Sequence, residues 1–238
     1  MTIRHWAILL GLAGVGTAIL FHWMVFFWVP TEATMGVVQR IFYVHVPAAW
    51  VAFLAFGIVA LCGAVYLWLR DERLDMAAVS AAEGGILFTT IVLLSGPLWA
   101  RIAWGTWWTW EPRLTLTLLL WFIFLGYFLV RRSTENPMKG RRFSAVVGIV
   151  GALNIPLIHM SVQWFRSLHP DPVVLRPDGP QLAEQMLTTL MVALLSFTLL
   201  FFSLFFLRYG VEKAERAMDA GAATPAQRPT GAAREVVR

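Results

Sequence analysis

Four tryptophans lie within seven residues of this chain, and an acid, a proline and an arginine follow them directly. Tryptophan combines a large apolar surface with one N–H donor, so a dense cluster forms either a rigid shelf for a large flat ligand or an anchor at a membrane surface. Anchoring alone does not require four tryptophans in so short a segment. We therefore expect a ligand shelf made by Trp104, Trp107, Trp108 and Trp110.

The histidines supply a second candidate chemistry, because imidazole nitrogens serve as axial ligands of haem iron. His45 and His169 each lie at the end of an apolar stretch, where they could face each other across a planar metal ligand near the tryptophan cluster. His22 and His159 lie inside two apolar stretches at a similar depth, as a buried haem between two helices would require. The positions alone leave both pairs open.

Arginines close to these residues could bind the propionate groups of a porphyrin. Arg40 precedes His45 by five positions, and Arg113 follows the tryptophan cluster. Both are expected either to contact a propionate or to extend to the lipid head groups. Arg101 and Arg166 are weaker candidates for the same role.

The composition indicates that a membrane protein must position these side chains. The chain has 238 residues, of which 58% are hydrophobic and 14% charged, and its mean hydropathy is +0.67. A bilayer crossing needs about 20 mostly apolar residues, and it is helical because lipid offers the backbone no hydrogen bonds. The sequence predicts an all-α polytopic fold, a bundle of six transmembrane helices at residues 6–29, 44–69, 84–103, 114–130, 143–165 and 186–207.

The basic residues predict the orientation of this bundle. Of the 19 Lys and Arg residues, 14 fall on the side of the two termini and 5 on the other side. Because cytoplasmic loops carry the excess of basic residues, both termini are expected in the cytoplasm and the tryptophan cluster on the outer face. The apolar run at residues 6–29 is too long for the core of a signal peptide, so it is expected to be retained as a span.

Several classes of protein are excluded by what the sequence lacks. Cys62 is the single cysteine, so the chain forms no internal disulfide and carries no Cys-x-x-Cys-His site for covalent haem. It has no phosphate loop and no nucleophile turn, which argues against ATP hydrolysis and serine-hydrolase chemistry in this chain. Its net charge of +5 is explained by basic loops that face anionic lipid and not by nucleic-acid binding.

The chain is expected to consist of one domain and a tail. Residues 1–209 are expected to form one membrane domain, and residues 210–238, which are rich in Ala, Gly and Pro, are expected to form a disordered cytoplasmic tail.

Three segments resemble the CcmC family of cytochrome c maturation proteins. Residues 104–115, WGTWWTWEPRLT, resemble the WWD signature of haem-handling membrane proteins. Residues 40–50, RIFYVHVPAAW, resemble the first outer-loop motif of the CcmC family, and residues 155–169, IPLIHMSVQWFRSLH, its fifth helix and third outer loop. The tryptophan run alone would also fit the related CcmF and CcsA branches. Those relatives usually have more spans, so six spans favour the CcmC family.

The resemblance implies a haem-delivery protein of the bacterial inner membrane, not an enzyme. It implies that haem b, transiently bound iron protoporphyrin IX, is held at the periplasmic face with two histidines as axial iron ligands. It also implies that the haem passes to the periplasmic chaperone CcmE, and that the chain works with the ABC-transporter subunits CcmA and CcmB and the single-span protein CcmD. The implied site residues are the iron ligands His45 and His169, together with Trp104, Trp107, Trp108, Trp110, Glu111, Arg40 and Arg113.

The sequence departs from the family signature at Glu111, where aspartate is usual. The charge is retained with one extra methylene, so Glu111 is expected to hydrogen-bond backbone amides at the start of the fourth helix with a changed reach. Two other functions stay open on the residues alone. One is a membrane cytochrome b for electron transfer with haem between His22 and His159, and the other is a haem-free permease subunit whose tryptophans only anchor it.

Overall fold

The computed structural model describes residues 2–170, 173–174 and 176–222, and this part of the chain is built from helices without a β-strand. Two short helical turns, Met24–Trp28 (π) and Val37–Ile41 (3-10), flank the loop that joins the first two long helices. The α-helices are α1 (Ile3–Trp23), α2 (Phe42–Leu69), α3 (Glu72–Trp104), α4 (Pro112–Ser133), α5 (Pro137–Ala152), α6 (Asn154–Trp164) and α7 (Glu184–Ala222).

Six helical segments are long and apolar enough to cross a membrane, which confirms the predicted all-α bundle of six spans. They are Ile3–Trp28, Val37–Leu69, Glu72–Trp104, Pro112–Ser133, Pro137–Trp164 and Glu184–Asp219. The fifth span consists of two helices, α5 and α6. Pro156 explains the break, because proline has no N–H and its ring clashes with the carbonyl four residues earlier, here that of Ala152 at the end of α5.

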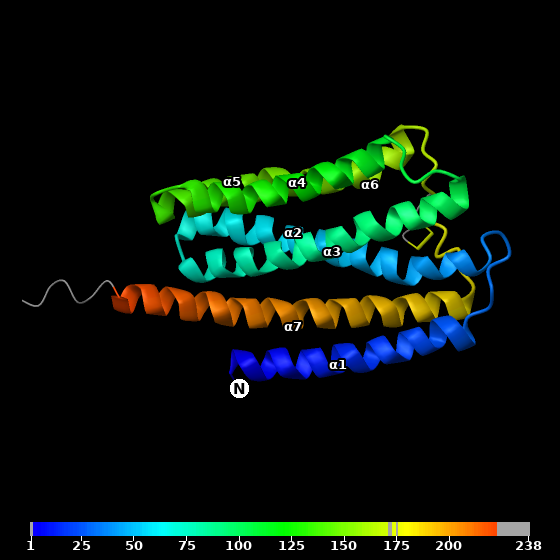
Figure 1. Cartoon of the computed structure of the whole chain (residues 1–238), viewed down its shortest axis with the longest axis horizontal. Coiled ribbons are helices and arrows are strands. Elements are labelled where there is room, and N and C mark those ends of the chain that lie inside the picture. The colour runs from blue at the N-terminus through cyan, green and yellow to red at the C-terminus, as the bar shows by residue number, and fades with distance from the viewer. Residues whose placement is uncertain (1, 171–172, 175, 223–238) are drawn as a thin grey trace, which may run out of the picture.

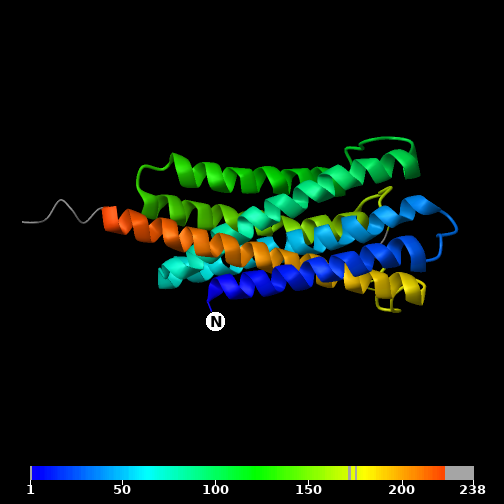
Figure 2. The same ribbon diagram turned by 60° about the horizontal axis from the view of Figure 1, so that its bottom comes forward.

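The helices run along one long axis (Figures 1 and 2), and α2 and α3 pack closely at the centre of the bundle. Gly85 permits this packing, because a Cβ at that position would lie 2.3 Å from a ring carbon of Phe56. On its other side, Phe56 stacks on Phe124 of α4 with ring centroids 3.7 Å apart. α7 lies between α1 and the α2–α3 pair, so α1 is the outermost span on that side (Figure 1).

The two ends of the bundle differ in what they carry. The N-terminus and the C-terminal end of α7 lie together at one end (Figure 1), which we call the terminal end. The loops that precede α2, join α3 to α4 and follow α6 lie at the opposite end, which we call the loop end. The tryptophan cluster, His45 and His169 therefore lie at the same end of the bundle, as predicted. That this end faces the outer side of the membrane stays a prediction from the distribution of basic residues.

The boundary predicted at residue 209 is not a structural boundary, because α7 continues to Ala222. Residues 210–222, which were expected in a disordered tail, are helical, and residues 223–238 of that tail lie outside the described residues. A buried ion-pair network explains the extension. Asp75 of α3, only 2% exposed, accepts two hydrogen bonds from Arg131 of α4 (2.7 and 2.5 Å) and one from Arg216 of α7 (2.6 Å). Arg216 also donates to Glu212 one turn earlier (2.9 Å).

Replacing Asp75 by alanine tests this network. The substitution leaves the guanidinium groups of Arg131 and Arg216 partly buried without their shared carboxylate, and breaking a buried pair in this way costs about 3 kcal/mol or more. We expect a clearly lowered midpoint of thermal unfolding for the purified protein in detergent. Arg73→Ala is the control, because that side chain is 83% exposed in its pair with Asp71 and its loss is expected to cost less than about 1 kcal/mol. Equal midpoints for the two variants would contradict the assignment.

Candidate functional site

A cavity of about 660 Å³ opens at the loop end and lies among α2, α3, α4, α6 and α7. Its size falls within the range of small-molecule sites, which are mostly apolar with a few polar groups. Thr89 also lines the cavity, so it extends from the loop end well down into the bundle. The histidines, the arginine and three of the tryptophans on its wall are the residues that can bind a ligand through polar or aromatic groups: His45, His159, His169, Arg113, Trp99, Trp104 and Trp108.

His45 lies in the first turn of α2, and its ring is held by a serine of α3. The His45 Nδ1 atom is 2.8 Å from Ser95 Oγ. Ser95 uses its own hydroxyl proton to donate to the carbonyl of Ile91 (2.7 Å), so its oxygen accepts from His45. The Nδ1–H tautomer follows, and it leaves the Nε2 lone pair of His45 free. An outer hydrogen bond that fixes the tautomer in this way is usual for metal-binding histidines.

His169 lies in the segment after α6 and also lines this cavity. Its Nδ1 has two neighbours, the carbonyl oxygen of Pro170 at 2.9 Å, which can only accept, and the guanidinium of Arg113, which can only donate. Because the contact with Pro170 is the shorter one, we assign the proton to Nδ1, and Nε2 is then free. Arg113 Nη1 lies 3.3 Å from the same ring nitrogen. Burial, and secondly the positive charge of Arg113, lowers the pKa of His169 to about 4. The ring is therefore neutral at pH 7, the state in which it can ligate a metal.

The four clustered tryptophans do not form a single shelf. Gly105, with φ of 76°, ends α3 in the left-handed conformation that favours glycine and turns the chain into the loop before α4. Trp104 and Trp108 line the cavity, whereas Trp107 and Trp110 are 56% and 76% exposed and are not part of its wall. The ring of Trp110 meets that of Trp108 edge to face at 5.8 Å. The shelf at the cavity is thus half as large as the sequence suggested.

Glu111 occupies the N-cap position of α4, but its carboxylate does not cap that helix. One carboxylate oxygen accepts from the hydroxyl of Ser167 (2.7 Å) and from the backbone N–H of Leu168 (2.9 Å). The Glu111 carboxylate therefore does not make the expected hydrogen bonds to amides at the start of α4. The side chain of Glu111 bonds instead to the segment that carries His169.

The remaining predicted residues lie away from the cavity or only at its edge. The guanidinium of Arg40 lies over the ring of Phe26 at 5.6 Å, and Arg40 does not line the cavity. His22 is exposed on α1 and donates from Nδ1 to the carbonyl of Ala18 in the same helix (2.8 Å). His159 of α6 does line the cavity, but α1 and α6 lie on opposite sides of the bundle (Figure 1). The structure therefore does not bring His22 and His159 together.

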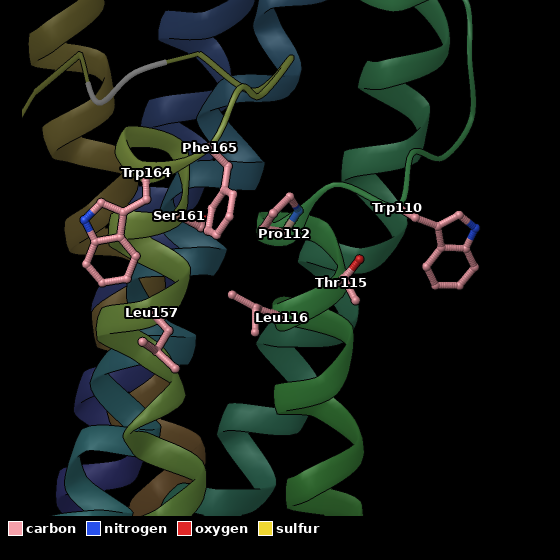
Figure 3. A pocket seen from close by; sticks show the side chains of 8 residues that line it. All are labelled: Trp110, Pro112, Thr115, Leu116, Leu157, Ser161, Trp164 and Phe165. Carbon is pink, nitrogen blue, oxygen red and sulfur yellow. The ribbon is translucent and has the colours of Figure 1, made fainter.

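A second, smaller pocket of about 440 Å³ lies beside α4 and α6 (Figure 3). Pro112 and Leu116 contribute to it from α4, and Trp164 and Phe165 from the end of α6. The ring of Trp110 projects away from α6 at the edge of this view. No titratable side chain belongs to the wall of this pocket, so it offers no chemistry comparable to that of the larger cavity.

Three residues that were not among the predicted site residues belong to this site. Trp50 and Trp99 line the cavity, and Ser95 holds the ring of His45. Trp99 meets the ring of His45 edge to face at 5.9 Å, and its indole nitrogen is buried without a hydrogen-bond partner. The indole nitrogen of Trp108 is also buried without a hydrogen-bond partner. A buried donor without an acceptor is costly, so a ligand with acceptor groups would complete this site.

Comparison with known proteins assigns the family. A family model described as Heme exporter protein C matches residues 1–224. The chain belongs to this family. Similar relatives carry the name Heme exporter protein C. The relative from Bradyrhizobium diazoefficiens is 38% identical over 74% of this chain, and the match covers 66% of the relative's own length, which is just under two thirds. Others are 31% identical, from Haemophilus influenzae (77% of this chain, 74% of the relative) and from Rhodobacter capsulatus (82% and 81%).

Membership of the Heme exporter protein C family confirms the resemblance drawn from the three sequence segments. Together with the six membrane-spanning helices, it makes the chain a multi-pass membrane protein with a role in haem handling for cytochrome c maturation.

Proposed function

We propose that this chain binds haem in the cavity at the loop end, with the Nε2 atoms of His45 and His169 as the axial ligands of the iron. The observation that carries the proposal is that both histidines reach one cavity with Nδ1 hydrogen-bonded and Nε2 free. Iron protoporphyrin IX supplies the four equatorial nitrogens itself, so two imidazoles complete the coordination. In the described residues, no group of three or more His, Cys, Asp or Glu side chains could hold a bare metal ion, which also favours a metal enclosed in a macrocycle.

The other groups on the cavity wall suit the rest of the haem molecule. Trp104 and Trp108 offer flat apolar faces for the porphyrin ring. The guanidinium of Arg113 and the unpaired indole N–H groups of Trp99 and Trp108 suit the negatively charged propionates. We therefore assign propionate binding to Arg113 in preference to Arg40.

A location at the loop end, between helix termini, supports a role in delivery. We propose that the chain presents transiently bound haem b at the periplasmic face of the bacterial inner membrane to the chaperone CcmE, which takes it covalently on its own histidine. In this proposal the chain is a haem-handling component and not an enzyme. It works beside the transporter subunits CcmA and CcmB and the single-span protein CcmD, while membrane lipid surrounds its helices.

The electron-transfer alternative has less support. Haem held between His22 and His159 requires two facing imidazoles inside the bundle, and His22 is exposed on the outermost helix. The haem-free permease alternative makes a different prediction, since no haem would copurify with the chain. Both alternatives are outcomes of the first experiment below.

The first experiment replaces His45 or His169 by alanine in cells that also contain the haem chaperone. Each substitution removes one axial ligand, so we expect the variants to insert into the membrane at normal amounts but to lose haem loading of the chaperone. The absorption spectrum of the purified variants should lose the signature of two imidazole ligands. His22→Ala is the matched control and is expected to behave as the wild type. Normal loading in both cavity variants, or loss only in the control, would sink the proposal.

Ser95→Ala tests the orientation of His45. Without the acceptor for Nδ1–H, the imidazole is free to turn and change tautomer, and loss of such an outer partner weakens metal binding by about 10- to 100-fold. Haem titration of the purified protein measures this change. Ser80→Ala is the control, because Ser80 donates to the carbonyl of Met76 in the same helix and is remote from the cavity. Unchanged affinity in Ser95→Ala would refute the assigned hydrogen bond.

Trp99→Phe and Trp108→Phe test the unpaired indole N–H groups. Each change keeps an aromatic ring and removes one donor, so haem affinity should fall about tenfold, as expected for a lost hydrogen bond to a charged group. Haem dimethyl ester, whose propionates are uncharged, should bind the variants and the wild type more equally. Trp50→Phe is the control on the same cavity wall, because its N–H already donates to Thr198 (3.2 Å). A loss of the same size for haem and its ester would show that the N–H groups do not bind propionates.

A further inference from the structure

We infer that Glu111 is a positioning residue that holds His169 in place for the iron, and that it does so through Ser167 and Leu168. This inference rests on the proposed function, because it assigns a role to a residue behind a proposed iron ligand. Glu111 does not line the cavity, although it belongs to the tryptophan-rich signature. The contacts of its carboxylate therefore define its role.

A continuous chain of hydrogen bonds joins Glu111 to the backbone of His169. The Ser167 hydroxyl donates its proton to a carboxylate oxygen of Glu111 (2.7 Å). The same hydroxyl oxygen accepts from the backbone N–H of His169 (3.0 Å). A hydroxyl has one proton and two lone pairs, so both bonds form at once. The Leu168 N–H donates to the same Glu111 oxygen (2.9 Å), so two successive amides of this segment are fixed from α4.

The segment depends on these bonds because it is not part of a helix. α6 ends at Trp164, and the Phe165 N–H makes the last bond back to that helix, with the carbonyl of Ser161 (3.0 Å). The backbone N–H groups of Leu168 and His169 lie beyond the helix and are bonded through Glu111 and Ser167. α4, in contrast, starts firmly, with Pro112 at its first position and the Glu111 carbonyl accepting from Thr115 (3.0 Å). The rigid start of α4 thus holds the irregular segment.

Reach, and not negative charge alone, explains why one side chain satisfies both donors. A single carboxylate oxygen makes both bonds, and the other oxygen is buried without a partner. Glutamine places a carbonyl oxygen at the same distance from the backbone and accepts both bonds without a charge. Alanine removes both bonds. The pair of substitutions therefore separates positioning from an electrostatic effect on haem.

The first measurement uses the protein without haem. Hydrogen–deuterium exchange of the segment 166–170 reports the amides of Leu168 and His169 directly. We expect exchange about tenfold faster or more in Glu111→Ala, since each lost bond to a carboxylate is worth about that factor. Ser167→Ala should free the His169 amide, and Glu111→Gln should resemble the wild type. Glu32→Ala is the control, because Glu32 accepts from backbone amides within its own loop at the same end. Unchanged exchange in Glu111→Ala would overturn the inference.

The second measurement is the absorption or electron paramagnetic resonance spectrum of the haem-loaded protein. With His169 out of place, Glu111→Ala and Ser167→Ala should lose part of the low-spin signal of iron with two imidazole ligands, whereas Glu111→Gln keeps it. A merely structural role of Glu111 would lower stability in Glu111→Ala without changing the spin state, and that result would also overturn the inference. If the wild type shows no low-spin haem, the proposed function fails, while the exchange experiment still decides whether Glu111 holds the segment.

Discussion

The requirement that every backbone polar group be paired inside a bilayer determines where this protein can place a functional site. Within the spans, the N–H and C=O groups are used by the helices, and irregular backbone is tolerated only where it is covered by protein or lines a cavity. The candidate residues accordingly lie at helix ends. His45 is in the first turn of α2, Trp104 is the last residue of α3, Arg113 is in the first turn of α4, and His169 follows α6.

The two ends of the bundle handle buried polar groups in opposite ways. At the terminal end, the buried carboxylate of Asp75 accepts hydrogen bonds from Arg131 and Arg216 and is also paired with Arg141, so it is satisfied without a ligand. At the loop end, buried polar side-chain atoms of five described residues have no hydrogen-bond partner, and these residues are Trp99, Trp108, Thr109, Glu111 and Thr115. Because unpaired buried polar atoms are rare in proteins, their concentration at one end supports the proposed binding of another molecule there.

The sequence predicted the features that depend on local pattern. Apolar length alone was enough for the six spans, and it placed His45 and His169 at the same end. It did not reveal the extension of α7, because the ion pairs of Arg216 with Asp75 join residues 141 positions apart. It also did not reveal which of the four clustered tryptophans line the cavity, because the direction of each ring depends on the turn at Gly105. Ser95 and Ser167 were missed for a related reason. Ser95 meets His45 only because α2 and α3 pack together, and Ser167 holds His169 through the backbone and through Glu111 of a distant segment.

The two proposed iron ligands are held with unequal rigidity, and this inequality fits a carrier better than a permanent haem protein. His45 is part of a helix at the centre of the bundle, and its ring is fixed by Ser95 of the adjacent helix. His169 lies on a segment outside the helices, which is joined to α4 by the side chain of Glu111 and approached by Arg113. Moving His169 away from the iron breaks a few hydrogen bonds, whereas moving His45 requires a change in helix packing. If both histidines ligate the iron as proposed, haem would be released from the His169 side while the fold around His45 stays intact.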